Sequence, residues 1–167
     1  MLPLTPETLA QKLLGLAASL LLITCVGALG AWASISAADF YGSLNQPIWA
    51  PPAGVFGPAW TSLFILMAVA AWRVWVAGAA RNHPAALVIY ALQLVFNVLW
   101  SWLFFAWHLG GAAFLNILLL WSLILFCLIS FYSINRVAGL LLVPYLAWVT
   151  FAAFLNYHIW QLNPALL

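Results

Sequence analysis

Long apolar runs, separated by short stretches with proline, glycine or polar residues, make up most of this 167-residue sequence. A helix needs about 20 residues to cross the hydrocarbon core of a bilayer, and five runs reach that length. The first run lacks a small-residue cleavage site after a short apolar region, so we expect it to be kept as a helix. We predict transmembrane helices at about residues 12–35, 53–78, 84–107, 112–132 and 137–161 of a single domain spanning residues 1–167.

Composition indicates that these helices lie in lipid rather than in water. Hydrophobic residues make up 68% of the chain and charged residues only 4%, whereas roughly a quarter of a soluble domain is charged. Only helices and closed barrels satisfy their own backbone groups inside a bilayer, and a barrel would alternate in polarity. The unbroken runs therefore predict an all-α membrane protein, a five-transmembrane-helix bundle. Cys25 and Cys127 fall inside apolar runs, and we expect both thiols to be buried as small hydrophobes.

The basic residues are unevenly distributed between the two ends of the predicted helices. Lys12, Arg81 and Arg136 lie at the starts of the first, third and fifth helices, and Arg73 lies near the end of the second. The connections at the other end contain no lysine or arginine. Because cytoplasmic connections are enriched in these residues, we predict a cytoplasmic N-terminus and a C-terminus on the outside.

The connection between the first two predicted helices, residues 36–52, is the only long one. Its three prolines restrict its conformations, and Trp49 and Phe56 are large apolar anchors near its end. One interpretation is a stiff turn with an interfacial aromatic residue. The other is a lid that folds over the helix ends and closes a cavity, because long ordered connections in compact proteins are often lids.

Polar and aromatic residues recur along one face of the predicted third helix. Tyr90, Gln93, Asn97, Trp100 and Phe104 follow one another at steps of three or four residues, which places them on one side of a helix. A carboxamide facing acyl chains would lose hydrogen bonds, so this face should point into the bundle. It serves either interhelical hydrogen bonds, each worth about 1 kcal/mol or less, or a ligand.

The predicted fifth helix carries a similar face, and Pro144 should bend that helix. Large π faces with a few amide groups favour a flat, hydrophobic, polycyclic ligand with polar edges. The candidate binding residues, which are aromatic, carry an amide or are small, are Trp49, Phe56, Trp60, Phe64, Gln93, Asn97, Trp100, Tyr145, Trp148, Ala152 and Asn156.

Three sequence blocks form the most specific pattern in the chain. They are WAPPAGVFGPAWTSLF at residues 49–64, QLVFNVLWS at residues 93–101 with Phe104 and Phe105 after it, and PYLAWVTFAAFLNY at residues 144–157. In this order and spacing they resemble the TspO/MBR family, the translocator proteins once called peripheral benzodiazepine receptors. The resemblance covers nearly the whole chain, and we expect a bacterial member.

The resemblance implies a five-helix protein, usually a homodimer, whose pocket binds porphyrins such as protoporphyrin IX, sterols and synthetic benzodiazepine-type ligands. Matching positions imply that Trp60, Asn97, Trp100, Trp148 and Ala152 line that pocket. In some bacterial relatives the tryptophans that match Trp60 and Trp148 are linked to light-dependent porphyrin breakdown. A receptor-like porphyrin-binding or transport protein is therefore the first hypothesis, an enzyme that photo-oxidises porphyrin the second, and a structural scaffold the third.

The sterol motif of the family's animal members is incomplete in this chain. That motif contains Leu or Val, then Tyr, then Lys or Arg. Leu155 and Tyr157 are present, but Gln161 stands where the basic residue is expected. Such motifs are weak even when complete, so we do not expect tight sterol binding.

Other classes of function lack the residues that they need. Ion channels and proton pumps place charged groups in mid-membrane, and the middle of every predicted span lacks them. His83 lies at one end of the bundle and His108 and His158 lie near the other, where Asp39 also falls; we expect interfacial solvation of these groups, no metal site and no cofactor. The net charge of +2 is too small for a nucleic-acid surface.

Overall fold

Five long helical spans make up the protein. The computed structural model describes residues 8–167, and this part of the chain is helical and contains no strand. The spans long and apolar enough to cross a membrane are Leu9–Ala33, Ala53–Val76, Pro84–Ala106, Gly110–Ile134 and Arg136–Leu162. The predicted five-helix bundle is confirmed, and the chain is an integral, multi-pass membrane protein.

Several spans change helical geometry along their length, and two short helices lie in the connections. The second span begins with a 3₁₀ turn, and the third ends with a π-helical turn. In chain order the elements are α1 (Leu9–Ala33), α2 (Ala37–Ser43), η1 (Ala53–Val55), α3 (Phe56–Val76), α4 (Ala79–Asn82), α5 (Pro84–Ser101), η2 (Trp102–Ala106), α6 (Gly110–Ile134), α7 (Arg136–Leu141) and α8 (Val143–Leu162).

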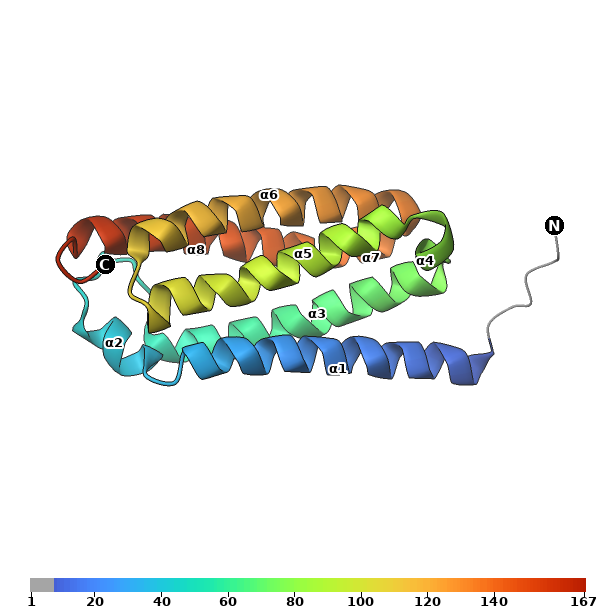
Figure 1. The fold of residues 1–167 in the computed structure, drawn as a ribbon, viewed down its shortest axis with the longest axis horizontal. Helices are drawn as coiled ribbons and strands as arrows, with labels where there is room; N and C mark the ends of the chain where they lie inside the picture. Colours follow the sequence, from blue (N-terminus) through green and yellow to red (C-terminus); the bar gives the residue numbers. More distant parts are fainter. Residues whose placement is uncertain (1–7) are drawn as a thin grey trace.

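The bundle is elongated, and its helices run side by side (Figure 1). α1 packs mainly on α3, α5 on α6, and α6 on α8, while α5 also contacts α1. Helix α2 and the C-terminus lie at one end of the bundle and α4 lies at the other (Figure 1). We call the first of these the lid end.

The interior is formed by apolar side chains from the central helices. Met67 and Val74 of α3 pack with Ile117 and Ile124 of α6, and all four are buried. Many side chains of α1 remain exposed, as expected of a helix that packs on one side and faces lipid on the other. Cys127 is buried as predicted, but Cys25 of α1 is exposed, so the prediction that both thiols are buried is wrong.

The bend predicted at Pro144 is present as a break between α7 and α8. Pro144 lies in the first turn of α8, where its missing N–H is not needed. After this break, α7 packs tightly on α6. The evidence is that a Cβ at Gly139 would lie only 2.6 Å from the backbone Cα of Tyr132. The last predicted helix is therefore two helices that meet at Leu142.

Residues 36–52, the lid segment, include the helix α2 and not only a loop. Tyr41 and Leu44 of this segment are buried. The Tyr41 hydroxyl donates to the Pro51 carbonyl at 3.0 Å, and the Gln46 side-chain amide donates to the Tyr41 carbonyl. These bonds fold the segment back on itself across the end of the bundle.

Candidate ligand pocket

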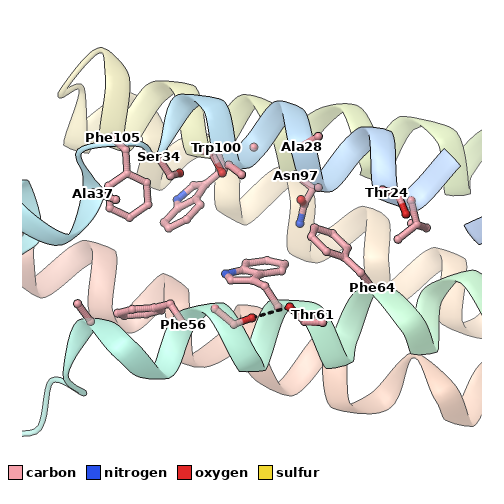
Figure 2. A pocket seen from close by; sticks show the side chains of 18 of the residues that line it. Thr24, Ala28, Ser34, Ala37, Phe56, Thr61, Phe64, Asn97, Trp100 and Phe105 are labelled. Atoms are coloured by element: carbon pink, nitrogen blue, oxygen red, sulfur yellow. Dashed lines mark hydrogen bonds between the residues drawn. The ribbon is translucent and has the colours of Figure 1, made fainter. Parts of the chain in front are cut away.

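A pocket of about 740 Å³ lies between α1, α3 and α5 in the half of the bundle nearest the lid end. Ala37 and Tyr41 of the lid segment contribute to its wall. In Figure 2, Phe56 and Thr61 of α3 lie across the cavity from Asn97 and Trp100 of α5. The space is within the usual range for small-molecule sites, about 300–1,000 Å³.

Aromatic rings form most of the pocket's rigid surface. Phe56, Trp60 and Phe64 follow at steps of four residues, so they lie on one face of α3, and all three line the cavity. The Trp60 and Phe64 ring centroids are 5.6 Å apart. On α5 the ring of Trp100 lines the cavity and stacks on Phe104 at 5.5 Å. A flat apolar ligand would meet ring surfaces on two sides.

Asn97 is the amide group of the pocket, and its orientation is fixed from behind. Its Nδ2 donates to the Tyr145 hydroxyl at 2.9 Å, and that hydroxyl donates to Gln93 Oε1 at 2.9 Å. The hydrogen bonds within residues 8–167 leave Asn97 Oδ1 without a donor, and this oxygen is not among the enclosed, unpaired atoms. Asn97 therefore offers the cavity a hydrogen-bond acceptor.

A second pair of hydrogen bonds holds the Trp100 ring in place. Its Nε1 donates to Asn156 Oδ1 at 3.0 Å, and Asn156 Nδ2 donates to the Gly110 carbonyl at 3.1 Å. Asn156 is buried, so both of its polar ends are paired away from water. The Trp100 ring is thus fixed as a wall, with its indole N–H turned toward α8.

The cavity is neutral. Among the described residues that line it, none is charged or a histidine, and the remaining polar side-chain groups are the indole N–H of Trp60 and hydroxyls of serine, threonine and Tyr41, besides the Trp100 indole that donates to Asn156. Burial raises the pKa of the Tyr41 phenol above its ordinary value, which keeps the hydroxyl protonated as a donor to Pro51. Burying an unpaired carboxylate costs far more than burying a paired polar group, so the pocket suits uncharged ligand surfaces.

Five of the predicted binding residues line the cavity: Phe56, Trp60, Phe64, Asn97 and Trp100. Gln93, Tyr145 and Asn156 lie behind this wall, where they form the hydrogen bonds that orient Asn97 and Trp100.

The other three predicted residues lie outside the lining. Ala152 is buried in the core. Trp148 packs on Phe56 at a centroid distance of 6.1 Å, and its enclosed indole N–H has no partner in the described part of the chain. Trp49 is 45% exposed and packs against Phe151 and His158 of α8.

The wall formed by α1 is missing from the predicted site, as are the lid residues Ala37 and Tyr41. Small and hydroxyl-bearing residues line it, among them Thr24, Gly27, Ala31 and Ser34. Their steps of three and four place them on one helix face. That spacing is visible in the sequence, but small residues occur in every predicted span and do not single out α1.

Two histidines lie near the lid segment, where they contact aromatic rings. His108 stacks on Phe40 of α2 with centroids 3.9 Å apart, and His158 meets Trp49 edge-on at 5.3 Å. No three potential metal ligands of the histidine, cysteine or carboxylate type gather anywhere in residues 8–167. The structure thus places both histidines against the lid segment.

Comparison with known proteins identifies the family of the chain. The sequence model of the TspO/MBR family matches residues 18–161. The chain belongs to the TspO/MBR family. It is 40% identical over 143 residues to the protein CrtK of Rhodobacter capsulatus, covering 84% of this chain and 87% of the relative.

Two further relatives are similar over most of their length. The tryptophan-rich protein TspO of Chlorobaculum tepidum is 42% identical over 126 residues, 75% of this chain and 80% of the relative. The translocator protein of Ovis aries is 36% identical over 126 residues, 74% of this chain and 75% of the relative. The resemblance seen in the sequence blocks is confirmed, and bacterial members are among the similar proteins.

Proposed function

We propose that this TspO/MBR protein binds a porphyrin, such as protoporphyrin IX, in the pocket between α1, α3 and α5, as a receptor or translocator. The observation that carries the proposal is the neutral cavity of about 740 Å³ with the rings of Phe56, Trp60, Phe64 and Trp100 around it. Aromatic faces in offset or edge contacts stabilise flat π systems by about 0.5–1.5 kcal/mol each. The carboxylates of a porphyrin would remain outside this neutral lining.

Asn97 supplies the polar contact of the proposed complex. Its Oδ1 accepts no hydrogen bond from the described residues, while its Nδ2 is held by Tyr145. A ligand N–H group placed against this oxygen gains a directional bond in an otherwise apolar site. Such placed polar groups fix orientation in pockets of this kind.

Light- and oxygen-dependent degradation of the porphyrin is the second candidate function. Trp60 supports it, because this indole lines the cavity. Trp148, the other tryptophan implied by the family resemblance, contacts the cavity wall through Phe56. Illumination of the protein with protoporphyrin IX in air, with and without Trp60→Phe, separates the two functions: spectral bleaching that requires Trp60 supports degradation, and stable binding supports the receptor.

The membrane placement that we propose has the N-terminus in the cytoplasm and the lid end outside. Lys12, Arg73 and Arg136 lie toward the end opposite α2, as the distribution of basic residues in cytoplasmic connections requires. We also propose a homodimer, from the family resemblance. We do not propose a sterol ligand, because Gln161 near the end of α8 replaces the basic residue of the sterol motif.

Titration of the reconstituted protein with protoporphyrin IX tests the proposed function. We expect saturable quenching of tryptophan fluorescence, weakened about tenfold or more by Trp60→Leu, a loss of about 1.4 kcal/mol. Trp121→Leu is the matched control, because Trp121 is a half-buried tryptophan of α6 that does not line the pocket. Quenching that does not saturate, or equal effects of the two variants, would contradict the proposal.

A further inference from the structure

The pocket opens through the side of the bundle between α1 and α3. Thr24 and Ala28 of α1 and Thr61 and Ile65 of α3 all line the cavity, and all four are exposed. These exposed lining residues come from two neighbouring helices at the same level, which indicates that the cavity reaches the surface through the gap between them. Because these residues lie inside two membrane spans, the opening faces lipid and not water.

Two hydrogen bonds join α1 and α3 on the side of this opening away from the lid. Toward the end opposite the lid, Ser19 Oγ donates to the Ala68 carbonyl at 2.8 Å, and Trp72 Nε1 donates to the Lys12 carbonyl at 2.8 Å. Nearer the lid end, α1 leans on α5, where a Cβ at Gly30 would lie 3.5 Å from Ser101 Oγ. Between the described residues no hydrogen bond joins α1 to α3 nearer the lid, where the cavity lies and where the Phe64 ring approaches Gly27 of α1.

The polar groups of the gap are already paired with their own helices. Thr24 Oγ1 donates to the Leu20 carbonyl at 2.8 Å, and Thr61 Oγ1 donates to the Gly57 carbonyl at 2.9 Å. A hydroxyl bonded to the carbonyl four residues earlier tolerates an apolar surrounding. An apolar molecule can therefore pass the gap without displacing protein hydrogen bonds.

The lid end, in contrast, is fastened to α8. Asn163 is buried at the end of that helix, its Nδ2 donates to the Asn45 carbonyl at 2.9 Å, and its Oδ1 accepts from the Asn45 backbone N–H at 2.9 Å. The same Nδ2 donates to the Ile159 carbonyl at 2.7 Å. One side chain thus holds both backbone polar groups of a lid residue.

We infer that ligands exchange between the pocket and the bilayer through the gap between α1 and α3, while Asn163 keeps the lid segment closed. The identity of the ligand in this inference rests on the proposed function. The path rests only on the positions of α1, α3 and the lid segment. An apolar, flat molecule concentrates in lipid, so this path brings it from the membrane directly to the rings of Trp60 and Phe64.

Carbene footprinting tests the path without any ligand. The full-length protein is reconstituted with a phospholipid that carries a diazirine at the end of an acyl chain, and in parallel exposed to an anionic, water-soluble diazirine. Insertion at Asn97, which is 6% exposed and lines the pocket, is measured by mass spectrometry.

Four variants test the two routes. Ala28→Phe narrows the gap. Its control is Ala18→Phe, at an exposed position of α1 away from the pocket. Asn163→Leu unfastens the lid, and Asn45→Ala, which keeps the backbone bonds, is its control.

We expect the lipid probe to label Asn97 and the water-soluble probe not to do so. Ala28→Phe should lower the lipid labelling about tenfold, a change of about 1.4 kcal/mol in the barrier, while Ala18→Phe, Asn163→Leu and Asn45→Ala leave it unchanged. Labelling of Asn97 by the water-soluble probe that rises in Asn163→Leu, or no labelling from lipid, would overturn the inference.

Porphyrin kinetics add a second readout on the same variants. If the gap is the path, Ala28→Phe lowers the association rate constant of protoporphyrin IX more than Ala18→Phe does, because a ring in the gap raises the barrier to entry. Faster exchange in Asn163→Leu than in Asn45→Ala would place the path through the lid and overturn the inference. A wild-type protein that does not bind protoporphyrin IX contradicts the proposed function, and the footprinting then decides the path alone.

Discussion

Asn97 of α5 and Tyr145 of α8 are joined by a hydrogen bond of 2.9 Å from the Asn97 amide to the Tyr145 hydroxyl. Tyr145 is almost fully buried, and its hydroxyl donates to Gln93 Oε1 at 2.9 Å. This pairing decides which end of the Asn97 amide faces the cavity. The polar character of the pocket therefore depends on a residue that does not line it.

Tyr145→Phe should weaken both the fold and ligand binding. The substitution leaves Asn97 Nδ2 and Gln93 Oε1 without their partner, which destabilises a buried site by about 1–3 kcal/mol. Asn97 is then free to rotate, so affinity for protoporphyrin IX should fall as well. Equilibrium unfolding in mixed micelles gives the first quantity, and fluorescence titration gives the second.

Tyr90→Phe is the matched control for this prediction. Tyr90 is also buried, and its hydroxyl donates to the Met67 carbonyl at 3.2 Å, but it does not line the cavity or contact Asn97. Its loss should destabilise the protein and leave affinity unchanged. If the two variants lose affinity equally, orientation of Asn97 by Tyr145 is not the cause.

Trp100→Phe separates the two roles of the Trp100 ring. Phenylalanine keeps an aromatic face on the cavity but removes the donor to Asn156 Oδ1, leaving a buried oxygen unpaired at a cost of about 1–3 kcal/mol. We expect lower stability and a partial loss of porphyrin affinity, with a larger loss for Trp100→Ala. Trp121→Phe, which removes a 2.8 Å bond to Thr150 away from the pocket, should reduce stability alone. If Trp100→Phe leaves the free energy of unfolding unchanged, the hydrogen bond to Asn156 does not stabilise the Trp100 ring.

The membrane class and the inward face of α5 could be predicted from the sequence because both follow from the cost of polar groups in lipid. A chain with so few charges cannot cover itself in water, and a helix that carries Gln93 and Asn97 cannot turn them toward acyl chains. Both amides are buried in the structure. Spacing then indicated that Trp100 shares their face, and it does line the pocket.

The wall on α1 and the depth of the α8 residues could not be predicted in the same way. Helix α1 is apolar on all sides, so its hydrophobic pattern does not distinguish the face toward lipid from the face toward a cavity. The periodicity predicts an inward face for Trp148 and Ala152, but it does not predict how far each side chain lies from the cavity. In the structure the ring of Phe56 lies against Trp148, and only packing in three dimensions determines that arrangement.

Gly139→Ala tests the close contact that follows the break in the last span. A Cβ at this position would lie 2.6 Å from the Tyr132 Cα and 2.8 Å from its backbone nitrogen, and backbone atoms cannot move aside as a flexible side chain can. We expect a loss of about 1–3 kcal/mol in unfolding free energy from overpacking. Gly42→Ala, in α2, meets nothing within 4 Å and should be neutral or slightly stabilising. Equal thermal stability of the two variants would show that α7 and α6 are not in such close contact.

Stability should decline in alkaline solution through Tyr41, which lies in α2 outside the membrane spans. Burial raises the pKa of its phenol above the ordinary value of 10.0, so the folded protein keeps a proton that the unfolded chain loses. The contribution to stability is therefore complete below that ordinary value and decreases as the pH rises from there through the folded-state pKa. The unfolding midpoint of wild type should therefore drop as the pH rises above the reference value of about 10. The Tyr41→Phe variant has no ionisable group at this position, so its unfolding midpoint should drop less. A parallel decline of the midpoint in both proteins would exclude Tyr41 as the cause.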